Sequence, residues 1–172
     1  ATLKYNPLLI KPNHHELGNI FGVEINSFDD ACVYAKKLQE KGARNVMVTM
    51  GEKGAVLIDE NGGVCTHSSP NGDVVSAVGS GDSSVAAFLA KYLSGDTYKN
   101  CLAFAVAAGS ATAFSRGLAT KDEIIKILGE NNVYENEPMS IHTSFKTGGI
   151  TDFFEIVNTF ALFKAILSPF YN

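Results

Sequence analysis

The sequence has 172 residues, of which 45% are hydrophobic and 19% are charged. A chain of this length buries roughly 70% of its unfolded surface on folding, which is enough for one ordinary hydrophobic core. The formal net charge of −4 offers no basic field for a polyanion, so we expect no nucleic-acid partner. The three cysteines are widely spaced and form no C-x-x-C pair, so they suggest neither a disulfide framework nor a zinc site, and a reducing cytoplasm fits best. The first residues also lack the pattern of a signal peptide.

The chain begins with the pattern of a strand followed by two helices. The apolar run at 8–10 predicts a buried strand. Asn13, with Glu16 three residues later, predicts a helix start, because this spacing forms a capping box. Ser27 opens a second predicted helix, which ends near Gly42.

The middle of the chain alternates strands with glycine turns and then changes to helices. We predict strands at 46–50, 55–58 and 64–67, and an extended segment at 74–78. The predicted helices then begin at Gly79-Ser-Gly-Asp82, at about Tyr98 and after the capping box Thr120-x-x-Glu123. Strands that alternate with helices predict an α/β sandwich with a substantially parallel sheet.

The character of the sequence changes at residues 131–172. Five of the eleven phenylalanines lie between Thr147 and Asn172. A membrane span needs about 20 mostly apolar residues, and the apolar run here is shorter and interrupted by polar residues. We therefore expect an amphipathic docking helix at 151–167, with an interfacial helix and a foreign extension as alternatives.

The residues 79–82 carry the strongest chemical signal. Two glycines let the chain turn sharply, so that backbone N–H groups at the positive end of the helix dipole can hold a phosphate. Asp82, beside that anion hole, can accept a proton from an attacking hydroxyl. Alternatively, Asp82 only stabilises the helix start, by about 1 kcal/mol. A Walker A loop is absent, and Ser84 replaces the third glycine of a Rossmann fingerprint.

Three weaker signals have competing structural explanations. Asn13 and Glu16 follow a strand and can hold magnesium-bound water near phosphates, or they form only a capping box. The glycines within 49–54 can bring backbone close to a nucleotide, or they serve a strand-turn-strand connection. The small residues of 105–111 allow a flat ligand to approach, or they allow tight helix packing.

The order and spacing of these motifs resemble the second half of the PfkB (ribokinase-like) sugar kinases. The matching motifs, in chain order, are Lys11-Pro-Asn-x-x-Glu16, Thr49-x-Gly-x-x-Gly54, Val78-Gly-x-Gly-Asp82 and Ala107-Ala-Gly-Ser-Ala111. The similarity covers about residues 3–130. Lys11-Pro-Asn13 and the segments 108–114 and 117–120 are most similar to the 1-phosphofructokinase and tagatose-6-phosphate kinase branch.

The resemblance implies a ribokinase-like three-layer α/β sandwich that is incomplete, because the N-terminal half of the family fold, with its lid, has no counterpart here. Residues 1–130 would form the C-terminal nucleotide-binding portion, and 131–172 would be a tail that the family pattern does not explain. The implied function is ATP-dependent phosphorylation of fructose 1-phosphate to fructose 1,6-bisphosphate, or of tagatose 6-phosphate. The alternative is a truncated, catalytically inactive nucleotide-binding or interaction module.

The resemblance also implies roles for individual residues. Asp82 would be the catalytic base, and the anion hole would consist of Gly79, Ser80 and Gly81. The nucleotide site would include Lys11, Asn13, Thr49, Gly51, Gly54, Ala108, Gly109 and Ser110. Mg²⁺ would be held through water by Asn13 and Glu16, and a K⁺ site would involve Ser76, Val78, Thr112 and Ser115. The partners would be ATP and a sugar phosphate in the cytoplasm, with a homodimer or a complementing chain, and without nucleic acid or membrane.

Overall fold

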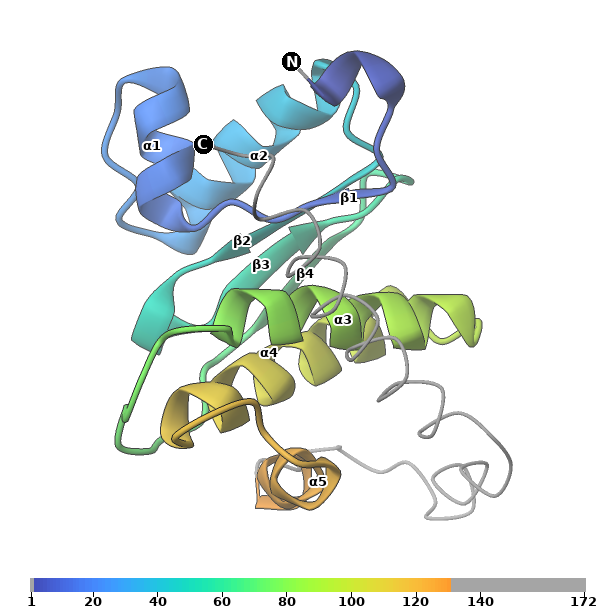
Figure 1. Cartoon of the computed structure of the whole chain (residues 1–172). Helices are drawn as coiled ribbons and strands as arrows, with labels where there is room; N and C mark the ends of the chain where they lie inside the picture. Colours follow the sequence, from blue (N-terminus) through green and yellow to red (C-terminus); the bar gives the residue numbers. More distant parts are fainter. Residues whose placement is uncertain (1, 131–172) are drawn as a thin grey trace, which may run out of the picture.

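The computed structural model describes residues 2–130, which form a four-stranded sheet between two layers of helices (Figure 1). The strands are β1 (Leu9–Ile10), β2 (Asn45–Thr49), β3 (Ala55–Ile58) and β4 (Val64–His67). The helices are η1 (Thr2–Tyr5), α1 (His14–Phe21), α2 (Phe28–Glu40), η2 (Gly51–Lys53), α3 (Ser80–Leu93), α4 (Tyr98–Phe114) and α5 (Lys121–Glu130). The helix predicted at 151–167 lies outside the described residues.

The sheet has the order β1-β2-β3-β4. β1 pairs in parallel with β2, with Leu9 opposite Asn45, whereas the pairs β2–β3 and β3–β4 are antiparallel. The prediction of a substantially parallel sheet is therefore wrong for the described strands. The reason lies in the short turns at 50–54 and 59–63, because a parallel pair needs a crossover of a dozen or more residues.

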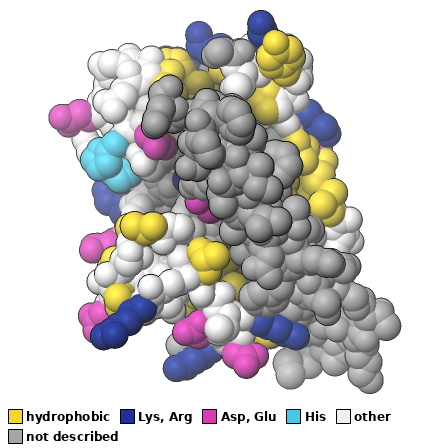
Figure 2. Space-filling view, in the orientation of Figure 1, with side chains coloured by type: hydrophobic (Ala, Val, Ile, Leu, Met, Phe, Trp, Pro, Cys, Tyr) yellow, Lys and Arg dark blue, Asp and Glu magenta, His cyan; other side chains and the backbone are white. Residues whose placement is uncertain are grey.

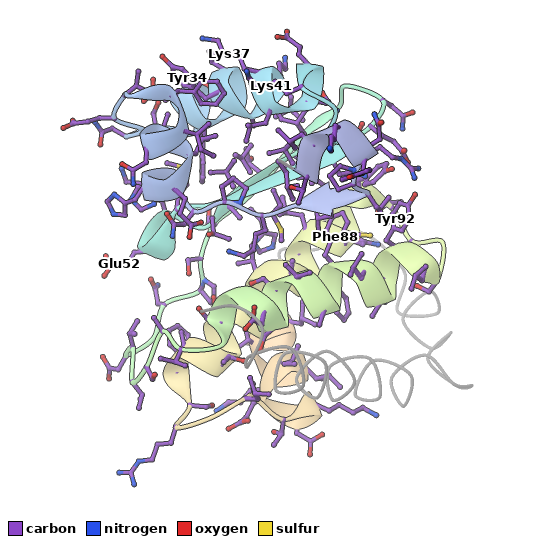
Figure 3. All side chains as sticks on the ribbon, turned by 45° about the horizontal axis from the view of Figure 1, so that its top comes forward. Tyr34, Lys37, Lys41, Glu52, Phe88 and Tyr92 are labelled. Carbon is purple, nitrogen blue, oxygen red and sulfur yellow. The ribbon has the colours of Figure 1, made fainter. Side chains whose placement is uncertain are left out.

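Each face of the sheet is covered by its own helices, and the buried side chains form a separate core on each side. Val46 and Val48 pack with Leu17 and Leu38 in the core beneath α1 and α2. Met47, on the opposite face of β2, packs in the core that α3 and α4 cover. Phe88 and Tyr92 of α3 point toward the sheet (Figure 3). The sheet centre is apolar on both faces, because successive side chains point to opposite sides and both sides are covered.

Local capping signals fix the starts of three helices as predicted. Capping boxes at Asn13 and Ser27 begin α1 and α2, and Thr120 and Glu123 form the same reciprocal hydrogen bonds at the start of α5. The segment 74–78, predicted to be extended, is instead an irregular loop with exposed valines. Among the described helices, none is long and apolar enough to cross a membrane. On the face shown in Figure 2, basic and acidic side chains are interspersed.

Candidate active site

The predicted anion hole is the turn at the start of α3. Gly79 is the N-cap residue and has φ +83°, a left-handed conformation that favours glycine. Ser83 N–H donates to the Gly79 carbonyl at 2.9 Å, which closes the first turn of the helix. The amides of Gly81 and Asp82 precede that bond, and helix geometry directs them out of the N-terminus. No side chain of the described residues caps this helix end, so the turn has the form of an anion site.

Lys11 lies against this turn. A Cβ atom built on Gly81 would lie 3.0 Å from Lys11 Nζ and 3.1 Å from Lys11 Cε. The ammonium group therefore lies over the first turn of α3. In the chain, Lys11 is separated from that turn by β2, β3 and β4. A fixed positive charge beside a helix N-terminus adds to the field that attracts an anion.

Asp82 occupies the first turn of α3 and is exposed. This position agrees with the interpretation of Asp82 as a first-turn acid that stabilises the helix. It also leaves the carboxylate accessible to an acceptor molecule beside the amides of the turn. Its role as the base therefore stays a prediction.

Asn13 and Thr49 meet at the carboxyl ends of the two parallel strands. They form an isolated parallel bridge, and Thr49 N–H donates to the Pro12 carbonyl at 3.2 Å. Lys11 comes from the same strand end, so this edge of the sheet faces the start of α3. Ligands of open α/β sheets bind outside the carboxyl ends of the strands, which agrees with the predicted place of the nucleotide.

Asn13 and Glu16 cap each other in the structure. Glu16 N–H donates to Asn13 Oδ1 at 2.8 Å, and Asn13 N–H donates to Glu16 Oε2 at 2.7 Å. Among residues 2–130, no group of three or more His, Cys, Asp or Glu side chains could hold a metal ion. Mg²⁺ in kinase sites keeps several waters and needs only one or two carboxylates beside substrate phosphates. One exposed carboxylate and one amide at the strand end fit such a water-mediated site.

The glycines of the segment 49–54 have a packing role as well. Gly51 and Gly54 both have positive φ, and a Cβ on Gly54 would lie 2.0 Å from the His67 carbonyl oxygen. Gly54 therefore lets the β2–β3 connection approach the backbone at the end of β4 and just after it. Glu52 extends away from the sheet at this turn (Figure 3). The structure supports the connection between strands, and nucleotide contact by this segment stays a prediction.

The predicted small residues of α4 contact α3. Ala108 is fully buried, and a Cβ on Gly109 would lie 2.3 Å from Ser84 Oγ. These two residues allow the helices to pack closely. Ser110, at the same level, lies with its hydroxyl 3.4 Å from that of Ser69 in the loop after β4. Of this group, Ser110 is the residue that reaches a loop.

Of the four predicted potassium-site residues, Ser76 and Val78 lie in the loop before α3, Thr112 lies in the last turn of α4, and Ser115 is the C-cap of that helix. Ser76 N–H donates to the Ala113 carbonyl at 3.0 Å, and Val78 N–H donates to Ser76 Oγ at 3.3 Å. The Thr112 carbonyl accepts the Ser115 N–H at 3.2 Å. The loop before α3 therefore meets the C-terminal end of α4, next to the turn at Gly79.

The loop after α4 is held by α5. Ser115 Oγ donates to Glu123 Oε1 at 3.2 Å, and Thr120 donates to the same carboxylate through its N–H at 2.6 Å and its hydroxyl at 2.8 Å. These hydrogen bonds, chiefly that from the Thr120 backbone, lower the pKa of Glu123.

Sequence reasoning missed two residues that contact the predicted site. Ser83 is 5% exposed and bonds to Thr112, and Leu118 lies against Gly79, where a Cβ would come within 3.0 Å of Leu118 Cδ2. The only signal for Ser83 was its position after Asp82. Nothing in the sequence pattern pointed to Leu118.

Comparisons with known proteins give this site a family context. The chain is 44% identical over 127 residues to the 1-phosphofructokinase of Bacillus subtilis, which covers 74% of this chain and 42% of that protein. It is 35% identical over 117 residues to the D-tagatose-1-phosphate kinase of Bacillus licheniformis, which covers 67% of this chain and 38% of that protein. The solved phosphofructokinase-2 from Escherichia coli in complex with potassium aligns with a TM-score of 0.67 at 31% identity, over 74% of this chain and 42% of that one.

The chain thus spans between 38% and 42% of the length of these relatives. Its fold is part of the ribokinase-like α/β sandwich. The family model for pfkB family carbohydrate kinases matches residues 2–125, and the motifs at Lys11, Thr49 and Asp82 all lie within that match. The chain belongs to the pfkB family of carbohydrate kinases.

Proposed function

We propose that this chain carries the nucleotide-binding part of an ATP-dependent sugar-phosphate kinase, with Asp82 as its base. The observation that carries the proposal is the contact between Lys11 and Gly81 at the start of α3. An ammonium group, the first-turn amides and an exposed carboxylate lie together there, at the edge where two parallel strands end. Phosphoryl transfer needs this combination of positioning and charge stabilisation more than covalent chemistry.

In the proposed mechanism, Asp82 takes the proton of a sugar hydroxyl while the hydroxyl oxygen attacks the γ-phosphorus of ATP. The bond from that phosphorus to the β–γ bridging oxygen breaks, and ADP leaves. The backbone of Gly79, Ser80 and Gly81, with Lys11, stabilises the charge on the transferred phosphoryl group. Asn13 and Glu16 would hold Mg²⁺ through water, and the ion would neutralise charge on the phosphates.

We propose fructose 1-phosphate as the acceptor, which gives fructose 1,6-bisphosphate, with tagatose 6-phosphate as the second choice. The support comes from the relatives, which are named for 1-phosphofructokinase and for D-tagatose-1-phosphate kinase activity. The second name concerns a different tagatose ester, so tagatose 1-phosphate joins the acceptors to be tested.

The accessory ion and the cellular setting are also proposals. K⁺ would be held by Ser76, Val78, Thr112 and Ser115; the phosphofructokinase-2 from Escherichia coli has been solved in complex with potassium. A homodimer or a complementing chain would complete the acceptor site. The three cysteines are free within the described residues, which suits the cytoplasm.

A second candidate function is nucleotide binding without phosphoryl transfer. It is favoured by the position of Asp82 in the first turn of α3, where a carboxylate stabilises the helix start without any catalytic role. In that case the site described here would bind ATP, and Asp82 would not act as a base.

The test measures ATP binding by calorimetry and ATP turnover with the three sugar phosphates, with and without Mg²⁺. Asp82→Asn removes the proposed base, and Asp122→Asn is the matched control, because Asp122 is also an exposed first-turn acid, on α5. Turnover that Asp82→Asn abolishes and Asp122→Asn preserves supports the kinase. ATP binding without turnover supports the second candidate, and no ATP binding contradicts both.

A further inference from the structure

A buried hydrogen-bond network links the C-terminal end of α4 to the start of α3. Thr112, in the last turn of α4, is 1% exposed. Its hydroxyl donates to Ser83 Oγ at 2.9 Å and accepts the Ala119 N–H at 3.2 Å. One hydroxyl therefore joins α4, α3 and the loop before α5, at a place that water does not reach.

The network acts on the proposed anion-hole turn. Ser83 follows Asp82 directly, and its N–H closes the first turn of α3 on the Gly79 carbonyl. The methyl group of Thr112 also faces Gly79, since a Cβ there would lie 3.8 Å from Thr112 Cγ2. Leu118, next to Ala119, packs on the same glycine. Thr112 thus contacts the turn from behind, through its hydroxyl and through its methyl group.

We propose that Thr112 is a positioning residue that holds the turn 79–82 in its anion-binding conformation through Ser83. For the ligand of that turn, this inference rests on the proposed function. Thr112 does not touch the phosphate; it fixes the residue that follows the base. Left-handed Gly79 has freedom to move, and loss of the buried hydroxyl would leave Ser83 Oγ and the Ala119 amide without this partner. The turn would then open more often.

The test uses variants of the full chain that separate the hydroxyl from the packing. Thr112→Val removes the hydroxyl and keeps the shape of the side chain, whereas Thr112→Ser keeps the hydroxyl. Ser83→Ala removes the other partner of the same bond and carries the test if Thr112→Val does not fold. Leu102→Val is the control for stability, because Leu102 is buried in the same helix but packs in the core that α3 and α4 form with the sheet.

Two readouts follow the turn. Hydrogen exchange of the Ser83 amide, which donates to the Gly79 carbonyl, reports opening of the turn without any ligand, and calorimetry reports ATP affinity. We expect Thr112→Val to raise exchange of the Ser83 amide and to weaken ATP binding, each by roughly tenfold. Thr112→Ser should stay near wild type, and the Thr112→Val/Ser83→Ala double variant should show less than the sum of the single effects.

Three results would overturn the proposal. The first is unchanged exchange and ATP affinity in a folded Thr112→Val variant. The second is an equal change of Ser83 amide exchange and ATP affinity in Leu102→Val, which would mean that Thr112 contributes only to general stability. The third is a loss of ATP affinity in Thr112→Val that saturating K⁺ restores, together with no loss in Ser83→Ala. That result would assign Thr112 to ion binding. If the wild type binds no ATP, the proposed function fails, and the exchange measurement still decides the role of Thr112.

Discussion

Gly81→Ala separates stability from ligand binding at the start of α3. The added Cβ would meet only the end of a flexible side chain, Lys11 Nζ at 3.0 Å and Cε at 3.1 Å. Gly81 is not among the glycines with positive φ, so alanine fits its backbone. Alanine in a helix is favoured over glycine by up to about 1 kcal/mol. We therefore expect unchanged or slightly higher stability, because Lys11 can move aside at little cost.

The same substitution should weaken ATP binding. It displaces the Lys11 ammonium and places a methyl group where the Gly81 backbone would approach a phosphate. Hydrogen bonds to charged groups contribute about 1.5–3 kcal/mol, so the loss corresponds to a Kd that rises roughly 10- to 150-fold.

Thermal unfolding and calorimetric titration with ATP measure the two effects on the same samples. Gly129→Ala is the matched control, because Gly129 lies in α5 and an added Cβ there meets no atom within 4 Å. It should leave ATP affinity unchanged. Unchanged ATP affinity in a stable Gly81→Ala variant would refute the placement of phosphate at this turn.

Two further predictions concern stability. The pKa of Glu60 is lowered, because Tyr98 and Arg44 donate hydrogen bonds to its carboxylate. The charged carboxylate therefore stabilises the fold above the ordinary carboxyl pKa, and this stabilisation is lost as pH falls through the lowered pKa. In urea unfolding at several pH values, Glu60→Gln should lower the free energy of unfolding by roughly 1 kcal/mol near neutral pH. On acidification the variant should lose less stability than wild type, and parallel curves of stability against pH would contradict this. Gly54→Ala should destabilise by about 2 kcal/mol or more, because φ is +106° and the new Cβ would strike the His67 carbonyl; an unchanged melting temperature would show that the turn has another conformation.

Local signals in the sequence were sufficient for the helix starts and for the turn at the candidate site. The capping boxes at Asn13, Ser27 and Thr120 depend on residues three positions apart, and all three form as predicted. The glycines at 79 and 81 likewise predicted a helix that begins with a sharp turn, and Gly79 has the left-handed conformation that such a turn uses.

Features that depend on distant residues were beyond the sequence. The parallel pairing was different, because the short turns at 50–54 and 59–63 were visible in the sequence and could have predicted the two antiparallel pairs. The segment 74–78 was predicted to be extended, but its backbone is held by a helix end, because the Val75 and Ser76 amides donate to the Ala113 carbonyl of α4. The Thr112–Ser83 bond joins residues on different helices, and no local spacing encodes it.

The affinity of the full chain for ATP, measured by calorimetry with wild type and Lys11→Met, tests the central claim most directly. Lys11 is half-buried and in place over the turn at Gly81, so its replacement removes one positive charge with a side chain of similar length. We predict that wild type binds ATP and that Lys11→Met binds it at least about tenfold more weakly. Equal affinity in the two proteins, or no binding to the wild type, would contradict a phosphate site at the start of α3.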